Sequence, residues 1–468
     1  MTHRRVHAPP VLDFASIRAE VGVVVPFDDA VLAAAAEAAA ADRAARDRID
    51  RTDLDLVTID PAGSTDLDQA LAVERRSDGW RVRYAIADVA AWVEPGGALD
   101  DAARARTQTY YSPDARAPLH PPVLGEAAAS LLPDGPRPAL LWTIDVASDG
   151  TTTDIGLERA TVRSRAQLTY GDVQRSIDEG DAPAPVVELA GLGPALLADA
   201  RRRGAIELGL PEQDVVADGD ERGRSCGAPT SPSSAGTPRC RCSPAAPPWL
   251  MLEGGVGVLR TLPDPDPDTF RASPRRTLGV RWDHGEHPGA VLARLDVSRP
   301  AHAAFADLAA ELLRGAAYTT FRGRPPVDPG HAGVGAPYAH VTAPLRRLVD
   351  RFASEACLSL VRGGRPPAWV DDALDPLPDL MAEGDRRGRA LERAVVDATE
   401  AFVLADRVGH VFPASVLESG PRSGTVVLDH PPVQARCDAA DLPLGGTVRV
   451  RCTEADVARR RVRFERVS

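Results

Sequence analysis

Hydrophobic and polar residues alternate along several short runs after residue 50, and this period of two predicts strands. The runs cover residues 54–59, 69–74, 80–86, 139–146 and 160–169, with turn residues at 77–79 and 148–150. Before them, residues 16–48 are rich in alanine and predict two helices. The break between these helices falls at residues 25–28, and Asp28 or Asp29 is the expected cap of the second helix.

Helical periodicity dominates the later part of the chain. It predicts helices over residues 99–106, 183–203, 301–313, 344–361 and 376–408. The period of two returns from about residue 414, in strands expected over 424–428, 446–452 and 459–467. Such a short all-β module suits an OB-type barrel, which is a common platform for single-stranded nucleic acid. A purely structural β cap is the equal alternative.

These elements predict an α/β fold, with a mixed sheet and enclosing helices. We expect three parts: an N-terminal helical segment (1–50), a central domain (51–408) and a small OB-like β domain (414–468). The central domain mixes helices and strands, as α/β and α+β folds do. With 468 residues and 44% hydrophobic content, the chain can build a large core.

Composition limits the cellular location and the kinds of binding site that we expect for this chain. No run of about 18 apolar residues is present, so we expect no membrane span and a cytoplasmic location. The six cysteines contain no pair spaced for zinc, and we expect reduced thiols. The formal net charge of −12 argues against nonspecific coating of nucleic acid, so any polyanion site must be local.

The strongest chemical signal is the segment Thr58-Ile59-Asp60-Pro61-Ala62-Gly63-Ser64-Thr65-Asp66-Leu67-Asp68-Gln69-Ala70. Its three carboxylates repel one another unless a positive group lies among them, and their hard oxygen atoms suit Mg²⁺ or Mn²⁺. The pattern indicates a metal-dependent phosphoryl-transfer site. Taken alone, such a motif is more often a turn capped by Asp60 with Asp66 and Asp68 facing solvent, and the other motifs decide between the two.

Further motifs follow in a fixed order: Tyr84-Ala-Ile-Ala-Asp88-Val, then Tyr111-Ser-Pro113, then Tyr338-Ala-His340-Val-Thr342-Ala-Pro344-Leu-Arg346-Arg347-Leu-Val-Asp350. Together with the aspartate cluster they resemble the catalytic domain of the ribonuclease II and ribonuclease R family of 3′-to-5′ exoribonucleases, the RNB domain. The resemblance covers residues 51–408, and its four ordered motifs are specific when taken jointly.

The resemblance implies roles for particular residues. Asp60, Asp66 and Asp68 match three of the four family aspartates that bind Mg²⁺ and position water. Gln69 takes the fourth position; its amide oxygen can coordinate a metal but lacks the charge, so we expect a second metal to bind less tightly. Either three carboxylates suffice in this chain, or the activity is reduced or lost.

The remaining implied contacts concern RNA. Arg346 matches the arginine that stabilises charge on the scissile phosphate, and Tyr111 matches the aromatic residue that packs on the terminal nucleotide. Tyr111 also fits plain core packing. Arg347 is expected either to contact a second phosphate or simply to begin a helix. Weaker candidates for RNA contact are Glu392, which could instead pair with Arg389, and Thr342, His340 and His331.

One segment departs from the family. Residues 221–248 are rich in proline, serine and arginine, hold three of the six cysteines, and cannot build a core. All 55 basic residues are arginine and asparagine is absent, which indicates G+C-rich coding DNA. Because one reading frame across residues 241–244 can encode Ser-Leu-Leu-Thr, as in relatives, we interpret the segment as disordered or translated out of frame.

The resemblance thus predicts hydrolysis of single-stranded RNA from its 3′ end to nucleoside 5′-monophosphates, with Mg²⁺ or Mn²⁺ as cofactor. Two alternatives remain: a catalytically impaired RNA-binding relic, and a hydrolase of small phosphoesters, which Tyr111 and Arg346 disfavour. We expect a monomer, and the sequence indicates no protein partner. RNA preference and final product length do not follow from the sequence.

Overall fold

The structure is a computed structural model. It describes residues 4–8, 12–41, 47–206, 213–217, 246–264, 278–283, 286–292, 294–296, 299–310 and 315–467. The predicted disordered or out-of-frame segment at residues 221–248 lies outside the described residues except for its last three positions, which begin helix α7 (Ala246–Gly254).

The first of two closed barrels has five strands: β2 (Ile49–Ile59), β3 (Gln69–Arg76), β4 (Gly79–Ala87), β7 (Arg137–Ala147) and β8 (Thr152–Leu168). The order around the barrel follows the chain, and neighbouring strands are antiparallel except where β2 pairs in parallel with β8 to close it. The long crossing between β4 and β7 leaves room for helix α3 (Ala98–Arg106) and a small hairpin of β5 (Tyr110–Tyr111) and β6 (Arg116–Ala117).

The second barrel forms the C-terminal domain. Its strands are β14 (Val411–Ser419), β15 (Gly424–Leu428), β16 (Gln434–Cys437), β17 (Thr447–Asp456) and β18 (Arg461–Val467), in the order β14-β15-β16-β18-β17. Its core gathers small and medium apolar side chains around Phe464, which is fully buried. Along β17, buried and exposed residues alternate over Thr447–Cys452, as expected of a strand with one face on the core.

The other regular elements are helices and short strand pairs. The remaining helices are α1 (Phe14–Glu20), α2 (Asp29–Ala40), η1 (Val89–Ala91), η2 (Leu124–Ala128), α4 (Tyr170–Glu179), α5 (Ala184–Val187), α6 (Leu189–Arg202), α9 (Pro288–Leu292), α10 (Pro300–Ala310), α11 (Leu348–Val361), α12 (Ala368–Ala373), α13 (Leu377–Leu404) and η5 (Ala405–Arg407). The strand pairs are β1 (Arg4–Ala8) with β9 (Gln213–Ala217), β10 (Val256–Thr261) with β11 (Ala317–Arg322), and β12 (Gly330–His331) with β13 (Ala336–Pro337).

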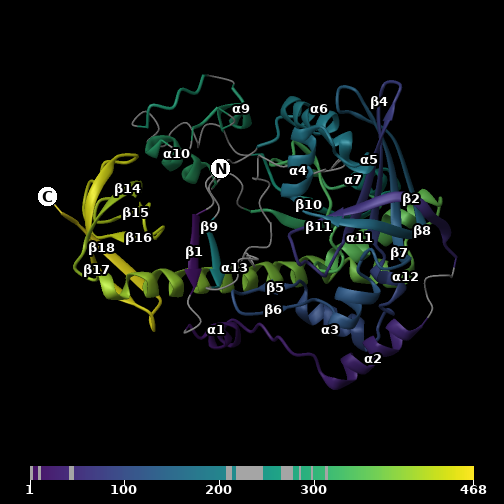
Figure 1. Cartoon of the computed structure of the whole chain (residues 1–468), viewed down its shortest axis with the longest axis horizontal. Helices are drawn as coiled ribbons and strands as arrows, with labels where there is room; N and C mark the ends of the chain where they lie inside the picture. Colours follow the sequence, from purple (N-terminus) through teal and green to yellow (C-terminus); the bar gives the residue numbers. More distant parts are fainter. Residues whose placement is uncertain are drawn as a thin grey trace.

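Helix α13 connects the two barrels and extends across the middle of the molecule (Figure 1). Near its start, Gly384 and Gly388 lie so close to Thr107 and Gln108 that an added Cβ would come within 3 Å of their side chains. Near its end, Ala401 and Leu404 are buried in the core of the second barrel. One rigid element therefore fixes the second barrel relative to the segment that leads into the β5–β6 hairpin.

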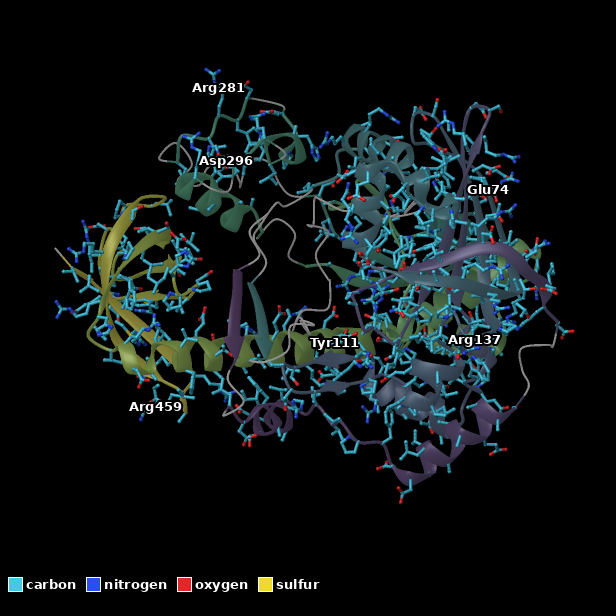
Figure 2. The ribbon with its side chains drawn as sticks, in the orientation of Figure 1. Glu74, Tyr111, Arg137, Arg281, Asp296 and Arg459 are labelled. Carbon is cyan, nitrogen blue, oxygen red and sulfur yellow. The ribbon has the colours of Figure 1, made fainter. Side chains whose placement is uncertain are left out.

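Side chains cover the outer strands of both barrels, and the labelled Tyr111 lies near α13, between the second barrel and the bulk of the first (Figure 2). The two faces of the first barrel's sheet belong to different cores. One core joins Val57, Leu71 and Trp142 to α11, and the other joins Leu56, Ala70 and their neighbours to α2 and Leu345. The barrel is thus covered by helices on more than one side.

The predicted fold class is confirmed, with corrections of detail. The mixed sheet closes into a barrel, which period-two patterning within single strands cannot reveal. The helix predicted over 344–361 begins only at Leu348, because residues 343–347 form a turn in which the N–H groups of Arg346 and Arg347 bond to the Ala343 carbonyl. Asp28 is the N-cap of α2, as expected, but its side chain makes no capping hydrogen bond.

Several elements were not predicted. These include β1 in the segment that was expected to be only helical, and β14 and β16 in the second barrel. Residues 311–313 of the helix predicted over 301–313 lie outside the described residues.

No helix in the described part of the chain combines the length and apolar character needed to cross a membrane.

Candidate functional site

The loop between β2 and β3 carries the three aspartates and is held at both ends. The Asp60 N–H donates to the Leu168 carbonyl at 3.0 Å, and the Gln167 side chain donates to the Ser64 carbonyl at 2.9 Å. Ser130 holds the other end, because its hydroxyl donates to the Thr65 carbonyl at 2.7 Å and accepts from the Leu67 N–H at 2.9 Å. The loop is therefore a fixed part of the barrel rim.

A glycine allows the turn within this loop. Gly63 has φ of +81°, and the Ser64 N–H bonds to the Pro61 carbonyl at 3.2 Å. This left-handed conformation suits glycine, since a Cβ there is strained. The turn reverses the chain between Asp60 and Asp66.

Asp68 joins the aspartate loop to the turn before α11. One carboxylate oxygen accepts the Leu345 N–H at 2.8 Å, and the other accepts Arg346 Nε at 3.1 Å. Asp68 is buried, with 4% of its surface exposed, so its charge depends on these partners. Two motifs that lie 277 residues apart in the chain thus meet through one carboxylate.

Two backbone hydrogen bonds with residues 107–109 also hold the turn at residues 343–347. The Thr109 N–H donates to the Arg346 carbonyl at 3.0 Å, and the Leu348 N–H donates to the Thr107 carbonyl at 2.9 Å. Residues 107–109 lead directly into β5, which carries Tyr111. This pairing brings Tyr111 to the same side of the barrel as Arg346 and the aspartates.

Tyr111 is half-buried beside these charges. Burial raises the pKa of its hydroxyl to about 12; Asp66 adds to the rise, while Arg346 and Arg116 oppose it. The hydroxyl therefore stays protonated near neutral pH. Its partial exposure and the charged groups that act on it fit a ring at the rim of the site better than a residue of the core.

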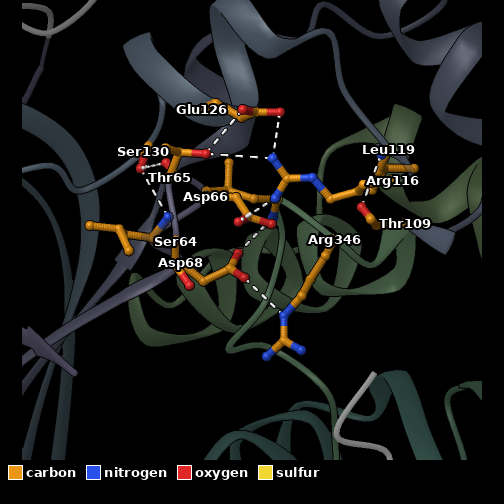
Figure 3. A network of polar contacts seen from close by, with 12 residues as sticks. Ser64, Thr65, Asp66, Asp68, Thr109, Arg116, Leu119, Glu126, Ser130 and Arg346 are labelled. Carbon is orange, nitrogen blue, oxygen red and sulfur yellow. Dashed lines mark hydrogen bonds and ion pairs between the residues drawn. The ribbon is translucent and has the colours of Figure 1, made fainter. Parts of the chain in front are cut away.

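Asp66 forms an ion pair that the sequence analysis did not predict. Arg116, on β6, places Nη1 2.6 Å from Asp66 Oδ1 and Nη2 2.6 Å from Glu126 Oε1 (Figure 3). Glu126 is itself oriented by the Thr65 hydroxyl, which donates to its other oxygen at 3.0 Å. The Arg116 guanidinium thus lies between two carboxylates, on the other side of the aspartate loop from Arg346.

Two carboxylates of the loop lie where their charged form is disfavoured. Burial raises the pKa of Asp60 to about 6, with Arg346 opposing the rise and Asp66 adding to it. Burial likewise raises the pKa of Asp68 to about 7, again against the effect of Arg346. A cation bound beside these carboxylates would stabilise their charged form.

The donor set fits a hard divalent cation in its chemistry, since it offers carboxylate oxygens and no soft ligand. Within the described residues, however, no three acidic, histidine or cysteine side chains are grouped closely enough to hold an ion as they stand. Asp66 and Asp68 are each paired with an arginine instead. An ion at this loop would therefore share these carboxylates with Arg116 and Arg346.

Gln69 does not face the same way as Asp68. Consecutive strand residues point to opposite faces of a sheet, and Gln69 is the first residue of β3, paired with Ile86. Its amide oxygen accepts a hydrogen bond from the Tyr84 hydroxyl on β4. The structure thus ties the amide to the neighbouring strand, while Asp68 binds the turn before α11.

Arg347 is held differently from Arg346. Its Nε and Nη2 each lie 2.9 Å from the carboxylate of Asp350, in the first turn of α11. Asp350 is fully buried and also accepts the Ala343 N–H at 2.6 Å. This bidentate pair stabilises the start of the helix, which was one of the two roles expected for Arg347.

The other predicted RNA contacts lie along the turn and α13. His340 bonds through Nδ1 to the Tyr318 hydroxyl at 2.7 Å, and its ring and that of His331 both pack edge-on against Tyr338. Thr342 is half-buried two residues further along the same segment. Glu392 is exposed on α13, one helical turn beyond Gly388.

The sequence analysis missed Arg116, Glu126, Ser130 and Tyr84 as partners of the aspartate loop. Arg116 stands five residues after Tyr111, and a hairpin with the four-residue loop 112–115 would have placed the two opposite each other, as they are. No comparable local signal pointed to Glu126 or Ser130, because η2 reaches the loop only through the folded barrel.

Comparison with known proteins identifies two domains in the chain. Residues 48–226 match the family described as RNB domain, and residues 410–467 match the RNase II-type exonuclease C-terminal S1 domain. Together these matches cover about half of the chain. Exoribonuclease 2 of Enterobacter sp. (strain 638) is 41% identical over 124 residues, which are 26% of this chain and 19% of that protein.

Solved structures share the fold. RNase R of Mycoplasma genitalium, in complex with ribose methylated single-stranded RNA, aligns with 97% of this chain and 77% of its own at a TM-score of 0.82 and 19% identity. Yeast Ssd1, described as a pseudonuclease, aligns with 87% of this chain and 52% of its own at a TM-score of 0.66 and 16% identity.

The protein is therefore an α/β protein with two domains. Its RNB domain contains the five-stranded barrel that carries the aspartate loop, and its S1 domain is the second barrel. The chain belongs to the RNB family. The matched part of Exoribonuclease 2 is only about a fifth of that relative's length.

Proposed function

We propose that the protein hydrolyses single-stranded RNA from its 3′ end and releases nucleoside 5′-monophosphates. The observation that carries this proposal is Asp68, which binds both the Leu345 N–H and Arg346 Nε and so assembles the aspartate loop, the arginine turn and Tyr111 at one place. The names of the related proteins, Exoribonuclease 2 and RNase R, support the same reaction class.

Arg346 is suited to bind the scissile phosphate. Its Nε is used by Asp68, and Figure 3 shows the outer nitrogens of the guanidinium pointing away from that carboxylate. A guanidinium offers further N–H donors in a planar fork that matches phosphate oxygens. Asp68 therefore fixes the direction in which Arg346 donates, which keeps the donors in place while negative charge develops on the phosphate.

Asp60, Asp66 and Asp68 are the residues that would hold Mg²⁺ or Mn²⁺. When bound, such an ion lowers the pKa of water and offsets charge on a phosphate oxygen. The protein's part is to keep the backbone of the loop in place, through Ser130, Gln167 and the Leu168 carbonyl, so that only the carboxylate side chains have to turn toward an ion.

Tyr111 is proposed to pack on the base next to the cleaved bond. Its half-buried ring lies near both Asp66 and Arg346. Stacking accepts any base, because every base has a π face. This would position the terminal nucleotide without imposing a sequence preference.

The test uses the full chain with single-stranded RNA labelled at its 5′ end and Mg²⁺. We expect a ladder that shortens from the 3′ end, and Asp68→Asn should lower the rate by at least about 100-fold, since preorganised charge at the reacting phosphate is removed. Asp145→Asn, which breaks the Arg81 ion pair on the same barrel, is the matched control. No shortening by the wild type, or equal rates for Asp68→Asn, would refute the proposal.

A second candidate is a catalytically impaired RNA-binding protein. Gln69 in place of a carboxylate and the Arg116 ion pair on Asp66 favour it, and yeast Ssd1 shows that this fold occurs in a pseudonuclease. It predicts salt-dependent RNA binding without turnover. In that case the wild type should bind RNA and leave it uncut with Mg²⁺ present, whereas a wild type that shortens RNA from its 3′ end excludes this candidate.

A further inference from the structure

Arg116 occupies an unusual place for an arginine in an acidic site. Its two outer nitrogens each lie 2.6 Å from a carboxylate oxygen, one on Asp66 and one on Glu126. Only 24% of the side chain is exposed. The guanidinium stays charged, because arginine is not deprotonated in proteins. A positive charge that bridges two carboxylates is the arrangement in which divalent ions are also found.

The backbone holds Arg116 in this position. It is paired with Tyr111 across the β5–β6 hairpin. The turn of that hairpin is tied to α1, because Arg18 donates to the Ser112 hydroxyl at 2.6 Å and forms an ion pair with Asp114. Arg116 is therefore part of an anchored hairpin and does not depend on its own side-chain contacts for its place.

The charges near the aspartate loop balance with a single divalent ion. Four carboxylates contribute here, on Asp60, Asp66, Asp68 and Glu126, and two guanidiniums, on Arg116 and Arg346, oppose them. When all four carboxylates are ionised, as a bound cation would favour, two negative charges remain, which one divalent ion neutralises. A second divalent ion would make the set positive before any substrate binds, at a cost in the low dielectric of a buried site.

The remaining donors do not supply a second set of ligands. The Gln69 amide oxygen is bonded to Tyr84 on the opposite face of β3. Glu126, which could join Asp66 in a second site, is taken by Arg116 and Thr65. In the described part of the chain no acidic, histidine and cysteine side chains are grouped to hold a metal as they stand, either at the aspartate loop or elsewhere.

We propose that Arg116 takes the place of a second divalent cation between Asp66 and Glu126, so that the protein binds one divalent ion per chain. This inference rests on the proposed function, since it concerns the cation site of that activity. Unlike a bound metal ion, the Arg116 guanidinium cannot dissociate into solvent, so its positive charge stays in the site.

The experiment is a Mn²⁺ titration of the metal-free full chain without RNA, in which free Mn²⁺ is followed by electron paramagnetic resonance. We expect one bound Mn²⁺ per chain for the wild type and two for Arg116→Gln, since the substitution frees Asp66 and Glu126. Arg81→Gln is the matched control, because Arg81 has a similar exposure and also pairs with an aspartate on the first barrel. It should still bind one Mn²⁺.

A double variant locates the second ion. In Arg116→Gln with Glu126→Gln, one of the two carboxylates that would hold the ion is removed, and we expect the count to return to one. Two Mn²⁺ on the wild type, one on Arg116→Gln, or two on the double variant would each overturn the inference. The wild-type count decides the matter alone if Arg116→Gln does not fold, as judged by circular dichroism.

RNA cleavage is measured separately on the same samples, which keeps the two proposals distinguishable. A wild type that binds one Mn²⁺ but does not shorten RNA contradicts only the proposed function. A wild type that shortens RNA and binds two Mn²⁺ contradicts only the role of Arg116.

Discussion

The two barrels of this protein share their strand number and their manner of closure, yet they differ in what their loops carry. Each has five strands and is completed by one parallel pair, β2 with β8 in the first and β16 with β18 in the second. In the first barrel, the β2–β3 loop and the long β4–β7 crossing bring Asp66, Asp68 and Arg116 together. In the second, short connections leave charged residues on the outside.

The arginines show the same difference. Arg346 and Arg116 lie beside partly or fully buried carboxylates next to the first barrel. Arg436, Arg451 and Arg459 of the second barrel are about half exposed or more, and their partners are exposed or half-exposed acids. Buried pairs set geometry, whereas exposed pairs contribute little to stability and can be exchanged for another anion. We therefore expect chemistry at the first barrel and only general RNA attachment at the second.

The largest expected effect separates Arg346 from its neighbour. Arg346→Lys should lower kcat for RNA cleavage by about 100-fold, because an ammonium cannot bind Asp68 and a phosphate with a planar fork. Arg347→Lys should mainly lower the thermal stability, since Arg347 pairs with the buried Asp350. Single-turnover cleavage and thermal unfolding of both variants check this. Equal losses of kcat would show that both arginines act on the phosphate.

A smaller effect is expected at Tyr111. Tyr111→Ala should weaken binding of the terminal nucleotide by about tenfold or more, given the worth of one base stacked on an aromatic ring. Tyr111→Phe keeps the ring and should retain most of the activity. Cleavage rates at subsaturating RNA compare the two. If Tyr111→Phe is as impaired as Tyr111→Ala, the hydroxyl rather than stacking matters.

At the second barrel we expect a change in binding without a change in chemistry. Replacing Arg436, Arg451 and Arg459 by glutamine should weaken RNA binding several-fold and reduce the salt slope by roughly one for each phosphate that is no longer neutralised. The rate at saturating RNA should not change. Replacing Arg51, Arg165 and Arg175, which are similarly exposed and paired near the first barrel, is the control. An equal effect of both sets would remove the distinction between the barrels.

The smallest effect is a pH dependence of stability in the metal-free protein. Burial raises the pKa of Asp60 to about 6 from 3.8, so the folded state binds this proton more tightly than the unfolded state does. The stabilising contribution is complete below about pH 4 and is lost as the pH rises through about 6. Asp60→Asn should therefore gain a few degrees in Tm relative to the wild type over this range.

Differential scanning fluorimetry with and without Mg²⁺ measures this difference. Added Mg²⁺ should raise the Tm of the wild type more than that of Asp60→Asn. Asp145→Asn serves as the control with the opposite sign, because a hydrogen bond from Arg81 lowers the pKa of Asp145. A Tm difference that does not grow with pH would show that Asp60 carries no buried charge.

Much of this fold was predictable because its signals are local. The alternation along residues 69–86 and the turn at 77–79 define β3 and β4. The ordered motifs predict that Asp60, Asp68, Tyr111 and Arg346 belong to one site, and Asp68 and Arg346 are in contact. Barrel closure was not predictable, since β2 pairs in parallel with a strand about a hundred residues later. The same holds for Glu126 and Ser130, whose contacts with the aspartate loop exist only after the barrel has formed.

Gln69 shows the limit of motif alignment. Its position within the motif indicated a weaker metal ligand, but strand alternation turns it toward Tyr84 and away from the face of Asp68. Asp66 shows the converse limit, because no motif indicated that an arginine from a separate hairpin would pair with it. In both cases the sequence did not reveal which side chain would lie beside the residue in the folded protein, Tyr84 beside Gln69 and Arg116 beside Asp66.

Helix α13 sets a fixed distance between the β5–β6 region and the second barrel. Gly388 packs beside Gln108 and Tyr110, and Ala401 lies in the core of the second barrel, so about 20 Å of rigid helix separates these points. At the roughly 3.4 Å spacing of stacked nucleotides this is about six residues of a single strand. For an RNA strand that follows α13, as the proposed function would allow, we expect dissociation to accelerate once the strand is shorter than this length.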